Sequence, residues 1–295
     1  MTTLSALIEA YVASRNVDAA AQSRLAFWDR ELGAKPIAEI TEEDVDAALV
    51  RLAERGRLVP RRGKASQNAG KPLSGGTINR FVSQLAGLYR YAKRLRLLKR
   101  SFVPPTSGVE KAPEPVDPDK YLRPEEVERL LTIARVVDQR WGKLCALILL
   151  AFHTGLRRGN LLALRWADVD LEHRTLTVLE TKNGRPMIAA LSERAAAELA
   201  RLPRPNPQAL VFCRRHDTQR PYSFRALWLR VCEEAGLPGR VFHELRHGCG
   251  SALAARGINQ AQIMAIMGHQ TLTASARYMH HSTEDKRQVV DRVFG

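Results

Sequence analysis

The stretch VFHELRHGCG, residues 241–250, contains two histidines one helical turn apart, with a glutamate directly after the first. The spacing His243-Glu244-x-x-His247 is the signature of zinc hydrolases, in which both histidines bind the metal and the glutamate acts as general base. Arg246 lies within the same turn, and its positive charge opposes the binding of a divalent cation. The stretch therefore has two interpretations, as a metal site or as a site that binds an anion.

A hydrolytic zinc site needs a third protein ligand. The longer metalloprotease pattern places a histidine six residues after His247, where this chain has Leu253. The acids further along are Glu284, Asp285 and Asp291, all near the end of the sequence. The four cysteines are widely spaced and form no C-x-x-C pair, which favours buried, reduced thiols over a cysteine-rich zinc site. No metal site is predicted, and a zinc hydrolase is kept only as a minor alternative.

The charge of the chain points to a polyanion as partner. The 295 residues carry a net charge of +15, and residues 51–100 alone hold 14 basic side chains and one acidic side chain. Such a positive block attracts nucleic acid, although a solvated basic face or an anionic membrane surface would have the same composition. The candidate DNA contacts in this block are Arg61, Arg62, Lys64, Lys71, Arg80, Arg90, Lys93 and Arg94.

Neither a signal peptide nor a membrane helix is predicted. Glu9 interrupts the first apolar stretch, and no small-residue cleavage site follows it. The longest apolar run, residues 144–152, is too short to span a bilayer and is typical of a buried helix. We therefore expect a soluble, cytoplasmic protein that does not bind membranes.

The first third of the chain predicts a small helical bundle. Apolar residues from Leu4 to Val12 share one face of a helix, Thr41 with Asp44 predicts a capped helix start, and a strong amphipathic pattern covers residues 77–98. The segment 57–76 is basic and poor in apolar residues, which predicts a mobile loop. Five prolines in residues 104–118 mark the domain boundary. We expect domains at 1–105 and 121–295, joined by an extended linker at 106–120.

The second domain is predicted to be mostly helical with a small β-hairpin. Pro124 followed by two acids starts a helix, and Gly155 follows the apolar run as a helix stop. Alternating residues on both sides of Asn183-Gly184 predict a hairpin with Lys182 at its tip. From Ser192 to the end the pattern is helical again. The predicted fold class is therefore mainly α, with a hairpin in the second domain.

Four segments in the second domain carry the candidate chemistry: TGLRRGNLLALRW (154–166), ETKNGR (180–185), HELRHG (243–248) and IMGHQTLTASARYMH (266–280). In this order they resemble the tyrosine recombinase, or phage integrase, family, whose catalytic domain shows TGLR, a hairpin lysine, HxLRH, LGH and a final RY. The resemblance covers residues 121–281. Residues 1–105 resemble the helical, SAM-like core-binding domain of that family more loosely.

The resemblance implies an active site of Arg157, Lys182, His243, Arg246, His269 and Tyr278. Tyrosine would be the nucleophile that exchanges a phosphodiester for a phosphotyrosine bond, so that rejoining needs no ATP. The two arginines present planar forks suited to phosphate oxygens. The lysine would protonate the departing 5′ oxygen, the first histidine would take the tyrosine proton, and the second would bind a non-bridging oxygen. Neither a metal nor another cofactor is implied.

Each of these residues also has a structural interpretation. A lone tyrosine is usually half-buried packing, a lysine beside a turn is usually solvated, and Arg157 could pair with Asp168 or Asp170. His247 is expected to be a buried structural histidine and Glu244 an ordinary exposed residue. Asn160 stands where the family usually has an acid, which leaves a DNA-binding protein without chemistry as the other alternative.

Membership of this family would make double-stranded DNA the partner. The protein would be a monomer in solution and a homo-tetramer on synapsed DNA, exchanging strands in two steps through a Holliday junction. This activity would serve DNA integration, excision or dimer resolution. The tail after Tyr278 carries an apolar helical patch of Val289, Val290, Val293 and Phe294, which predicts that it docks on a neighbouring protomer.

Overall fold

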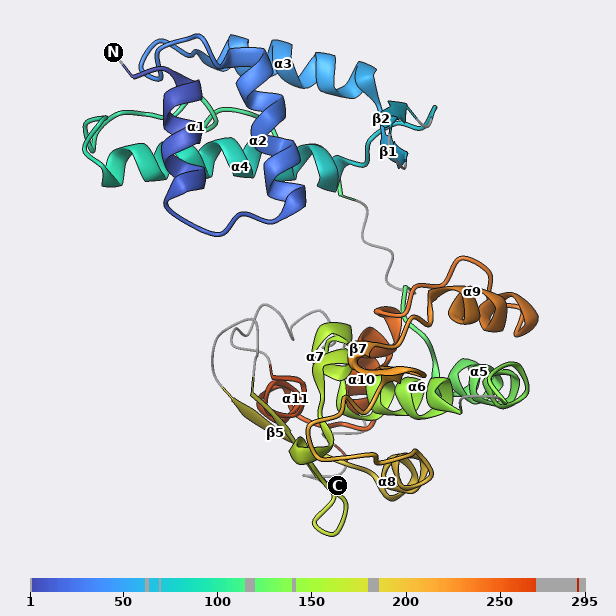
Figure 1. Ribbon diagram of the computed structural model, residues 1–295. Helices are drawn as coiled ribbons and strands as arrows, with labels where there is room; N and C mark the ends of the chain where they lie inside the picture. The colour runs from blue at the N-terminus through green and yellow to red at the C-terminus, as the bar shows by residue number, and fades with distance from the viewer. Residues whose placement is uncertain are drawn as a thin grey trace. The chain divides into compact units, whose positions relative to one another are not determined.

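The computed structural model describes residues 2–61, 64–68, 70–114, 120–139, 142–179, 186–268 and 291, with side chains everywhere in these ranges except 59–67. The chain divides into two compact units, Met1–Val116 and Asp117–Gly295 (Figure 1). Each unit has its own buried apolar core. The described residues are mainly helical, as the sequence predicts. Across these same residues, no helix is both long enough and apolar enough to cross a membrane.

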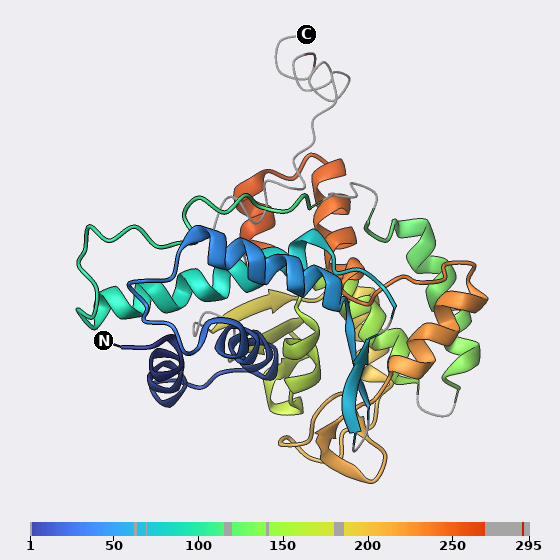
Figure 2. The same cartoon turned by 90° about the horizontal axis from the view of Figure 1, so that it is seen from above.

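The first unit is built on four helices: α1 (Leu4–Ala13), α2 (Ala19–Leu32), α3 (Glu42–Arg55) and α4 (Gly75–Arg94). α1 and α2 cross α4 steeply, and both are seen nearly end-on in Figure 2. Two buried aromatic side chains in this unit form hydrogen bonds through their polar atoms. The indole of Trp28 donates to the carbonyl of Phe81 at 2.9 Å, and the hydroxyl of Tyr89 donates to the carbonyl of Ile37 at 3.0 Å.

α1 and α3 begin where the sequence predicts them, and α4 begins two residues before the predicted start at Thr77, but α2 is not evident from the sequence. Thr41 and Asp44 form the predicted capping box at the start of α3. α2 is polar on average, so the sequence shows no clear apolar face for its four buried residues, Leu25, Phe27, Trp28 and Leu32. The last helix is shorter than predicted, because α4 ends at Arg94 and the backbone turns at Arg96 with φ 59°.

The basic segment 57–76, predicted as a mobile loop, contains a β-hairpin. β1 (Leu58–Arg61) pairs with β2 (Lys64–Asn68) in antiparallel register, from Leu58 opposite Asn68 to Arg61 opposite Lys64. The base of the hairpin is closed by the amide of Arg57, which donates to the carbonyl of Lys71 at 2.9 Å. The loop prediction is wrong because this ribbon is held by backbone pairing, which leaves no apolar pattern in the sequence.

Part of the predicted linker packs on the first unit. The side-chain amide of Asn79, on α4, donates to the carbonyl of Ala112 and accepts from its amide, both at 2.9 Å. The same nitrogen donates to Glu114 at 2.6 Å. Ala112 and Glu114 are therefore held against α4 by hydrogen bonds with the side chain of Asn79.

The second unit is arranged around a helix, Lys143–Thr154, whose central residues are apolar. Its helices are α5 (Pro124–Val137), α6 (Lys143–Thr154), α7 (Arg158–Ala163), α8 (Glu193–Ala200), α9 (Arg225–Glu234), α10 (Glu244–Ala255) and α11 (Gln260–Met267). Residues 144–151 of α6 are all buried, and α6 contacts α5, α7, α8 and α10. The predictions of Pro124 as a helix start and Gly155 as a helix stop are confirmed.

Two small sheets accompany these helices. β3 (Val169–Asp170), β4 (Thr175–Val178) and β5 (Met187–Ala190) form an antiparallel sheet in that order, after a 3₁₀ turn at Trp166–Asp168. β4 and β5 are the strands of the predicted hairpin, and its tip lies outside the described residues. A second hairpin, β6 (Cys213–Arg214) with β7 (Asp217–Pro221), interrupts the segment after Ser192 that the sequence predicts as wholly helical.

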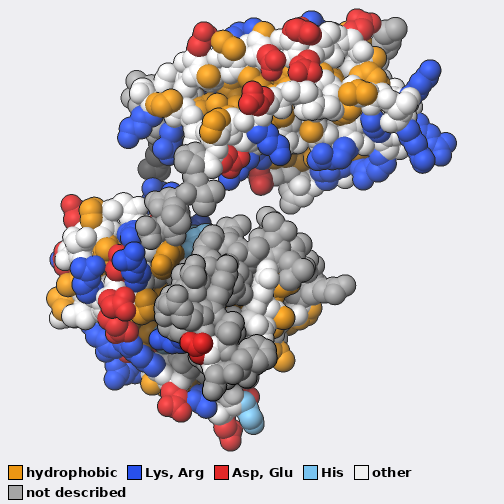
Figure 3. Space-filling view, turned by 180° about the vertical axis from the view of Figure 1, so that it is seen from behind, with side chains coloured by type: hydrophobic (Ala, Val, Ile, Leu, Met, Phe, Trp, Pro, Cys, Tyr) orange, Lys and Arg blue, Asp and Glu red, His pale blue; other side chains and the backbone are white. Residues whose placement is uncertain are grey.

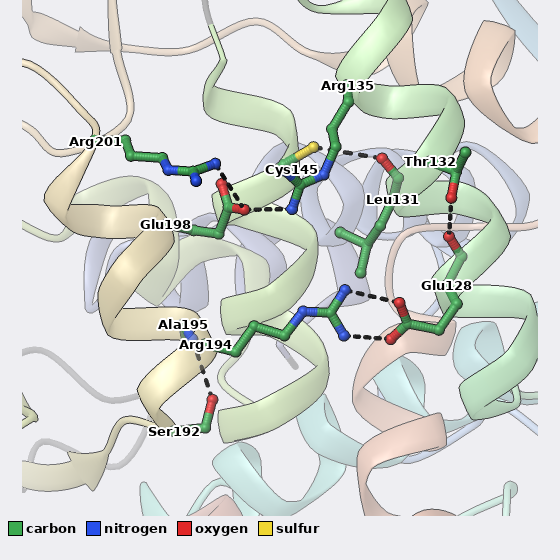
Figure 4. Close-up of polar contacts among 10 residues, drawn as sticks. All are labelled: Glu128, Leu131, Thr132, Arg135, Cys145, Ser192, Arg194, Ala195, Glu198 and Arg201. Atoms are coloured by element: carbon green, nitrogen blue, oxygen red, sulfur yellow. Dashed lines mark hydrogen bonds and ion pairs between the residues drawn. The ribbon is translucent and has the colours of Figure 1, made fainter.

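Ion pairs hold α8 against α5 beside α6 (Figure 4). The guanidinium of Arg194 makes a two-pronged contact with Glu128, at 2.5 and 2.7 Å. Glu198, which is 8% exposed, lies between Arg135 and Arg201. Such planar, paired contacts fix the direction of both side chains and thereby the spacing of the two helices.

Candidate active site and nucleic-acid interface

The turn that carries Arg157 is fixed by the end of α6. Gly155 adopts the left-handed conformation with φ 62°, and the amide of Leu156 donates to the hydroxyl of Thr154 at 3.2 Å. The carbonyl of Arg157 accepts from the amide of Leu161, so Arg157 caps the short helix α7. Its side chain is partly buried. The TGLR sequence, residues 154–157, thus forms a tight, internally hydrogen-bonded corner between α6 and α7, which we call the arginine corner.

The buried side chain of Arg246 joins α10 to this corner. Its guanidinium donates to the carbonyl of Gly155, and only 5% of the residue is exposed. His243 lies exposed at the start of the same helix, and its carbonyl accepts from the amide of Arg246 at 3.1 Å. The structure therefore brings the turn of Arg157 together with the helical turn that carries His243 and Arg246.

Glu244 is buried, contrary to the expectation that it is exposed. It is 3% exposed, and its carboxylate lies 3.5 Å from the guanidinium of Arg240, which also contacts Glu126 at 3.3 Å. Arg240 is four residues before Glu244, but its second partner, Glu126, is 114 residues away along the chain. The sequence therefore did not indicate this cluster of three charged residues. A buried glutamate engaged in an ion pair is poorly suited to act as the general base of a zinc site.

His247 is partly buried rather than fully buried, and its ring meets that of His243 edge-on with centroids 4.9 Å apart. Within the described ranges, His, Cys, Asp and Glu side chains form no group of three that could hold a metal ion.

The two acids considered as partners of Arg157 are engaged elsewhere. Asp168 accepts from the backbone amide of Arg165 at 3.1 Å. Asp170 accepts from the amide and the ring of His173, both at 2.8 Å, and these hydrogen bonds lower the pKa of its carboxyl. Both carboxylates therefore accept hydrogen bonds that stabilise turns within three residues of each aspartate. Asn160, in place of the usual acid, is partly buried in α7.

Three of the predicted active-site residues, Lys182, His269 and Tyr278, lie outside the described residues. The described segment before His269 packs on the turn of Arg157. Met267 ends α11 and packs on Gly155, where an added Cβ would lie 3.1 Å from the Cγ of Met267 and 3.2 Å from the sulfur of Cys249. Burial raises the pKa of the Cys249 thiol to about 12, so this thiol is a neutral packing group.

The sequence did not identify Met267 and Cys249 as neighbours of the site. The one available signal was the glycine in each of TGLR and MGH, because a glycine often marks a close approach of other atoms to the backbone.

The candidate DNA contacts fall into two groups in the first unit. Arg80, Arg90 and Arg94 are exposed along α4, whereas Lys93 is partly buried and donates to the carbonyl of Arg100 at 3.1 Å. Lys and Arg side chains gather along one edge of this unit (Figure 3).

The second group belongs to the hairpin. Arg61 and Lys64 are paired across β1 and β2, Lys71 is exposed at the hairpin base, and Arg62 lies outside the described residues. The structure therefore keeps the cations of α4 and those of the hairpin within one unit.

Residues 120–285 match the phage integrase family. Among curated proteins, the chain is 31% identical to the shufflon-specific DNA recombinase of Escherichia coli over 244 residues, which is 82% of this chain and 58% of that protein. It is 24% identical to the integrase of Salmonella phage P22 over 307 residues, covering 93% of this chain and 75% of that integrase. The chain thus spans little more than half the length of the first of these relatives.

Solved structures share the fold of the chain. The Tn1549 transposon integrase in complex with transposon right end DNA superimposes with a TM-score of 0.72 at 20% identity, covering 99% of this chain and 100% of that one. A lambda integrase tetramer bound to a Holliday junction gives a TM-score of 0.65 at 20% identity, covering 92% of this chain and 79% of that one. Since the family match extends over more than half of the sequence, the chain belongs to the phage integrase family.

Proposed function

We propose that the protein is a tyrosine-type, site-specific DNA recombinase that cleaves and rejoins strands through a 3′-phosphotyrosine intermediate. The observation that carries the proposal is the hydrogen bond from Arg246 to the carbonyl of Gly155. This hydrogen bond connects α10, which carries Arg246 and begins after His243, to the corner that carries Arg157. The proposal assigns these two arginines and the histidine to one phosphate-binding site. Buried or partly buried guanidinium groups with fixed neighbours are preorganised to bind a phosphate whose charge increases during reaction.

In this mechanism the hydroxyl oxygen of Tyr278 attacks phosphorus while His243 accepts its proton. The bond from phosphorus to the 5′ oxygen breaks, and Lys182 gives that oxygen a proton. Arg157 and Arg246 stabilise the charge on the non-bridging oxygens, together with His269. Reversal with the 5′ hydroxyl of another strand rejoins the DNA.

The charge of the first unit supports a role in DNA binding. The sequence contains no acid between Glu54 and Glu110, a stretch that includes α4 and the β1–β2 hairpin. Exposed cations without neighbouring acids release counterions from DNA when they bind phosphates, and this release favours association. We assign DNA contacts to Arg80, Arg90 and Arg94 on α4 and to the cations of the hairpin.

A homo-tetramer on synapsed DNA, formed from monomers, is the assembly that fits this chemistry, because two duplexes present four strands for cleavage. The lambda integrase tetramer on a Holliday junction, which has the same fold, supports this assembly. We place the protein in the cytoplasm, where its DNA substrate would be.

A nicked suicide substrate tests the proposal. Such a duplex loses a short 5′ fragment after cleavage, so that a covalent protein–DNA adduct accumulates. We expect an adduct that forms in EDTA and is absent from Tyr278→Phe, because the hydroxyl of the tyrosine is the nucleophile and no metal takes part. Denaturing gel electrophoresis measures the adduct, and sequencing the attached strand locates the cleaved bond.

Other results would favour the alternatives. Specific DNA binding without an adduct would indicate a protein of this fold without chemistry, for which Asn160 is the motivating feature. Hydrolysis that stops in EDTA would indicate the zinc enzyme, which the ion pair of the buried Glu244 disfavours.

A further inference from the structure

The β4–β5 hairpin carries Lys182 between its strands and is called the lysine hairpin here; its second strand, β5, contacts Gly268, the residue before His269. Met187 is the first residue of β5 and the partner of Val178 in the last pair before the hairpin tip. Gly268 follows α11 with φ 61°, and an added Cβ there would lie 2.6 Å from the sulfur of Met187 and 3.2 Å from its methyl carbon. The thioether therefore lies directly on the bare backbone of Gly268.

The preceding residue makes a matching contact on the arginine side. Met267 is 1% exposed and packs on Gly155, whose carbonyl accepts the hydrogen bond from Arg246. Two consecutive residues at the end of α11 thus contact the strand of the lysine hairpin and the corner of Arg157. Gly155 and Gly268 both have positive φ, and an added Cβ would overlap the sulfur of Met187 at Gly268 and crowd Met267 at Gly155, so both positions favour glycine.

We propose that Met187 is a positioning residue, which fixes the second strand of the lysine hairpin relative to the end of α11 and to the arginine corner. This inference rests on the proposed recombinase function. β4 and β5 pair over only four residues each, so few backbone hydrogen bonds join the two strands of the lysine hairpin. The contact between Met187 and Gly268 supplies a second attachment where the strand begins. Methionine suits this place because its flexible, polarisable side chain fits an irregular gap.

The proposed chemistry provides a readout specific to the lysine. As the tyrosine oxygen bonds to phosphorus, the bond to the 5′ oxygen breaks and that oxygen takes a proton from Lys182. If the 5′ oxygen is replaced by sulfur, the leaving group departs as a thiolate and needs no proton, because thiols are far more acidic than alcohols. A misplaced lysine therefore slows cleavage at oxygen but not at sulfur.

The experiment measures adduct formation by the full chain on two nicked duplexes that differ only in this bridging atom. We expect Met187→Ala to cleave the oxygen substrate about tenfold more slowly, because small misplacements of a catalytic group are costly. On the 5′-bridging phosphorothiolate it should equal the parent. Met187→Leu should recover most of the oxygen rate. The matched control is Ile188→Ala, since Ile188 is the next residue of β5 and is 72% exposed; it should behave as the parent on both substrates.

Equal slowing of Met187→Ala on both substrates would overturn the inference, and so would an unchanged rate on oxygen. Absence of an adduct from the parent protein would instead refute the proposed function. Thermal melting shows whether each variant is folded. Should the alanine variant unfold, Met187→Thr takes its place, because threonine shortens the side chain and favours a strand, and the same two outcomes decide.

Discussion

At the scale of single residues, Arg246 serves both the fold and the proposed chemistry. One nitrogen of its guanidinium binds the backbone of the arginine corner, and the fork is almost fully buried. We expect Arg246→Ala to lower the rate of adduct formation by about 10²–10³-fold, the loss typical of one donor to a developing oxyanion. Arg246→Lys should recover little, since an ammonium group lacks the planar fork.

The control for this prediction lies on the same helix. Arg256 follows α10, is exposed, and donates to the carbonyl of Ala252 at 3.3 Å. Arg256→Ala should retain the parental rate of adduct formation in the suicide assay. Equal losses in the two variants would mean that charge alone, and not the position of Arg246, supports cleavage.

Glu244→Gln separates the two interpretations of the HELRH sequence. Glutamine keeps the size of the side chain but loses the ionic contact with Arg240, which retains Glu126. We expect a loss of about 1.5 kcal/mol in the free energy of unfolding, the lower end for a hydrogen bond to a charged group, and a rate of adduct formation close to that of the parent. Thermal melting and the suicide assay measure the two effects. A complete loss of activity in a folded variant would favour the zinc mechanism.

At the scale of elements, Asp138 fixes the start of α6, the helix that ends at the arginine corner. Asp138 is 2% exposed, and one carboxylate oxygen accepts from the amide of Leu144 at 2.8 Å and from the hydroxyl of Tyr222 at 3.2 Å. We expect Asp138→Ala to lower the free energy of unfolding by about 1–2 kcal/mol through the lost cap. Asp138→Asn keeps an acceptor oxygen and should cost less, as measured by chemical denaturation.

The pH dependence of the same variant has a definite sign. Burial raises the pKa of Asp138 above its ordinary value, so the charged carboxylate is less favourable in the folded protein than in the unfolded chain. The folded state therefore loses stability as pH rises through this raised pKa, and the loss is absent below the unfolded pKa of about 3.9. The stability of Asp138→Asn relative to the parent should consequently increase from acid to neutral pH. The opposite trend would show that the carboxylate is stabilised as a charge.

The β1–β2 hairpin is predicted to contact DNA phosphates. Replacing Arg61, Arg62 and Lys64 together by alanine should weaken binding at all sequences and reduce the slope of log affinity against log salt by about 2–3, if each cation neutralises one phosphate. Fluorescence anisotropy with Tyr278→Phe as the parent measures both quantities. Arg51→Ala is the control, because Arg51 pairs with Glu31 at 2.6 Å within the first unit. An unchanged slope in the triple variant would remove the hairpin from the interface.

The sequence predicted elements that carry a local signal and missed those held by distant or backbone contacts. Thr41, Pro124 and Gly155 mark helix ends through their own side chains or backbone, and the alternation around residues 175–190 marks a hairpin with one buried face. The strands β6 and β7 were missed because most of their side chains are polar and exposed. The candidate site shows the same division. Arg157, His243 and Arg246 follow from motifs, whereas the packing of Met187 and Met267 on two glycines depends on the tertiary fold.

At the scale of the whole molecule, the two units have different roles in the proposed recombinase. The first carries exposed cations on α4, with further Lys and Arg residues in the sequence of the hairpin, and the second carries the arginine corner with its histidine. The pairing of Asn79 with Ala112 ties residues up to 114 to the first unit. Fewer residues of the proline-rich sequence are therefore left between the two units than the predicted linker of 106–120 contains.

The last prediction concerns the assembly of several copies. The tail sequence 284–295 lies outside the described residues apart from Asp291, and it carries the apolar residues Val289, Val290, Val293 and Phe294. We expect deletion of 284–295 to leave adduct formation at a single nicked site nearly intact, because the proposed catalytic residues all precede it. Formation of a synapsed complex of two duplexes should fall, since each protomer would lose an apolar contact with its neighbour.

Native gels with two duplexes of different length measure synapsis directly, and Tyr278→Phe serves as the control that assembles without cleaving. Full recombination by the truncated chain would refute the role of the tail. Loss of both synapsis and single-site cleavage would instead place the tail within the protomer that carries it, as part of the support for its own tyrosine. The two measurements together therefore decide whether the active sites are coupled through the tail or complete within each copy.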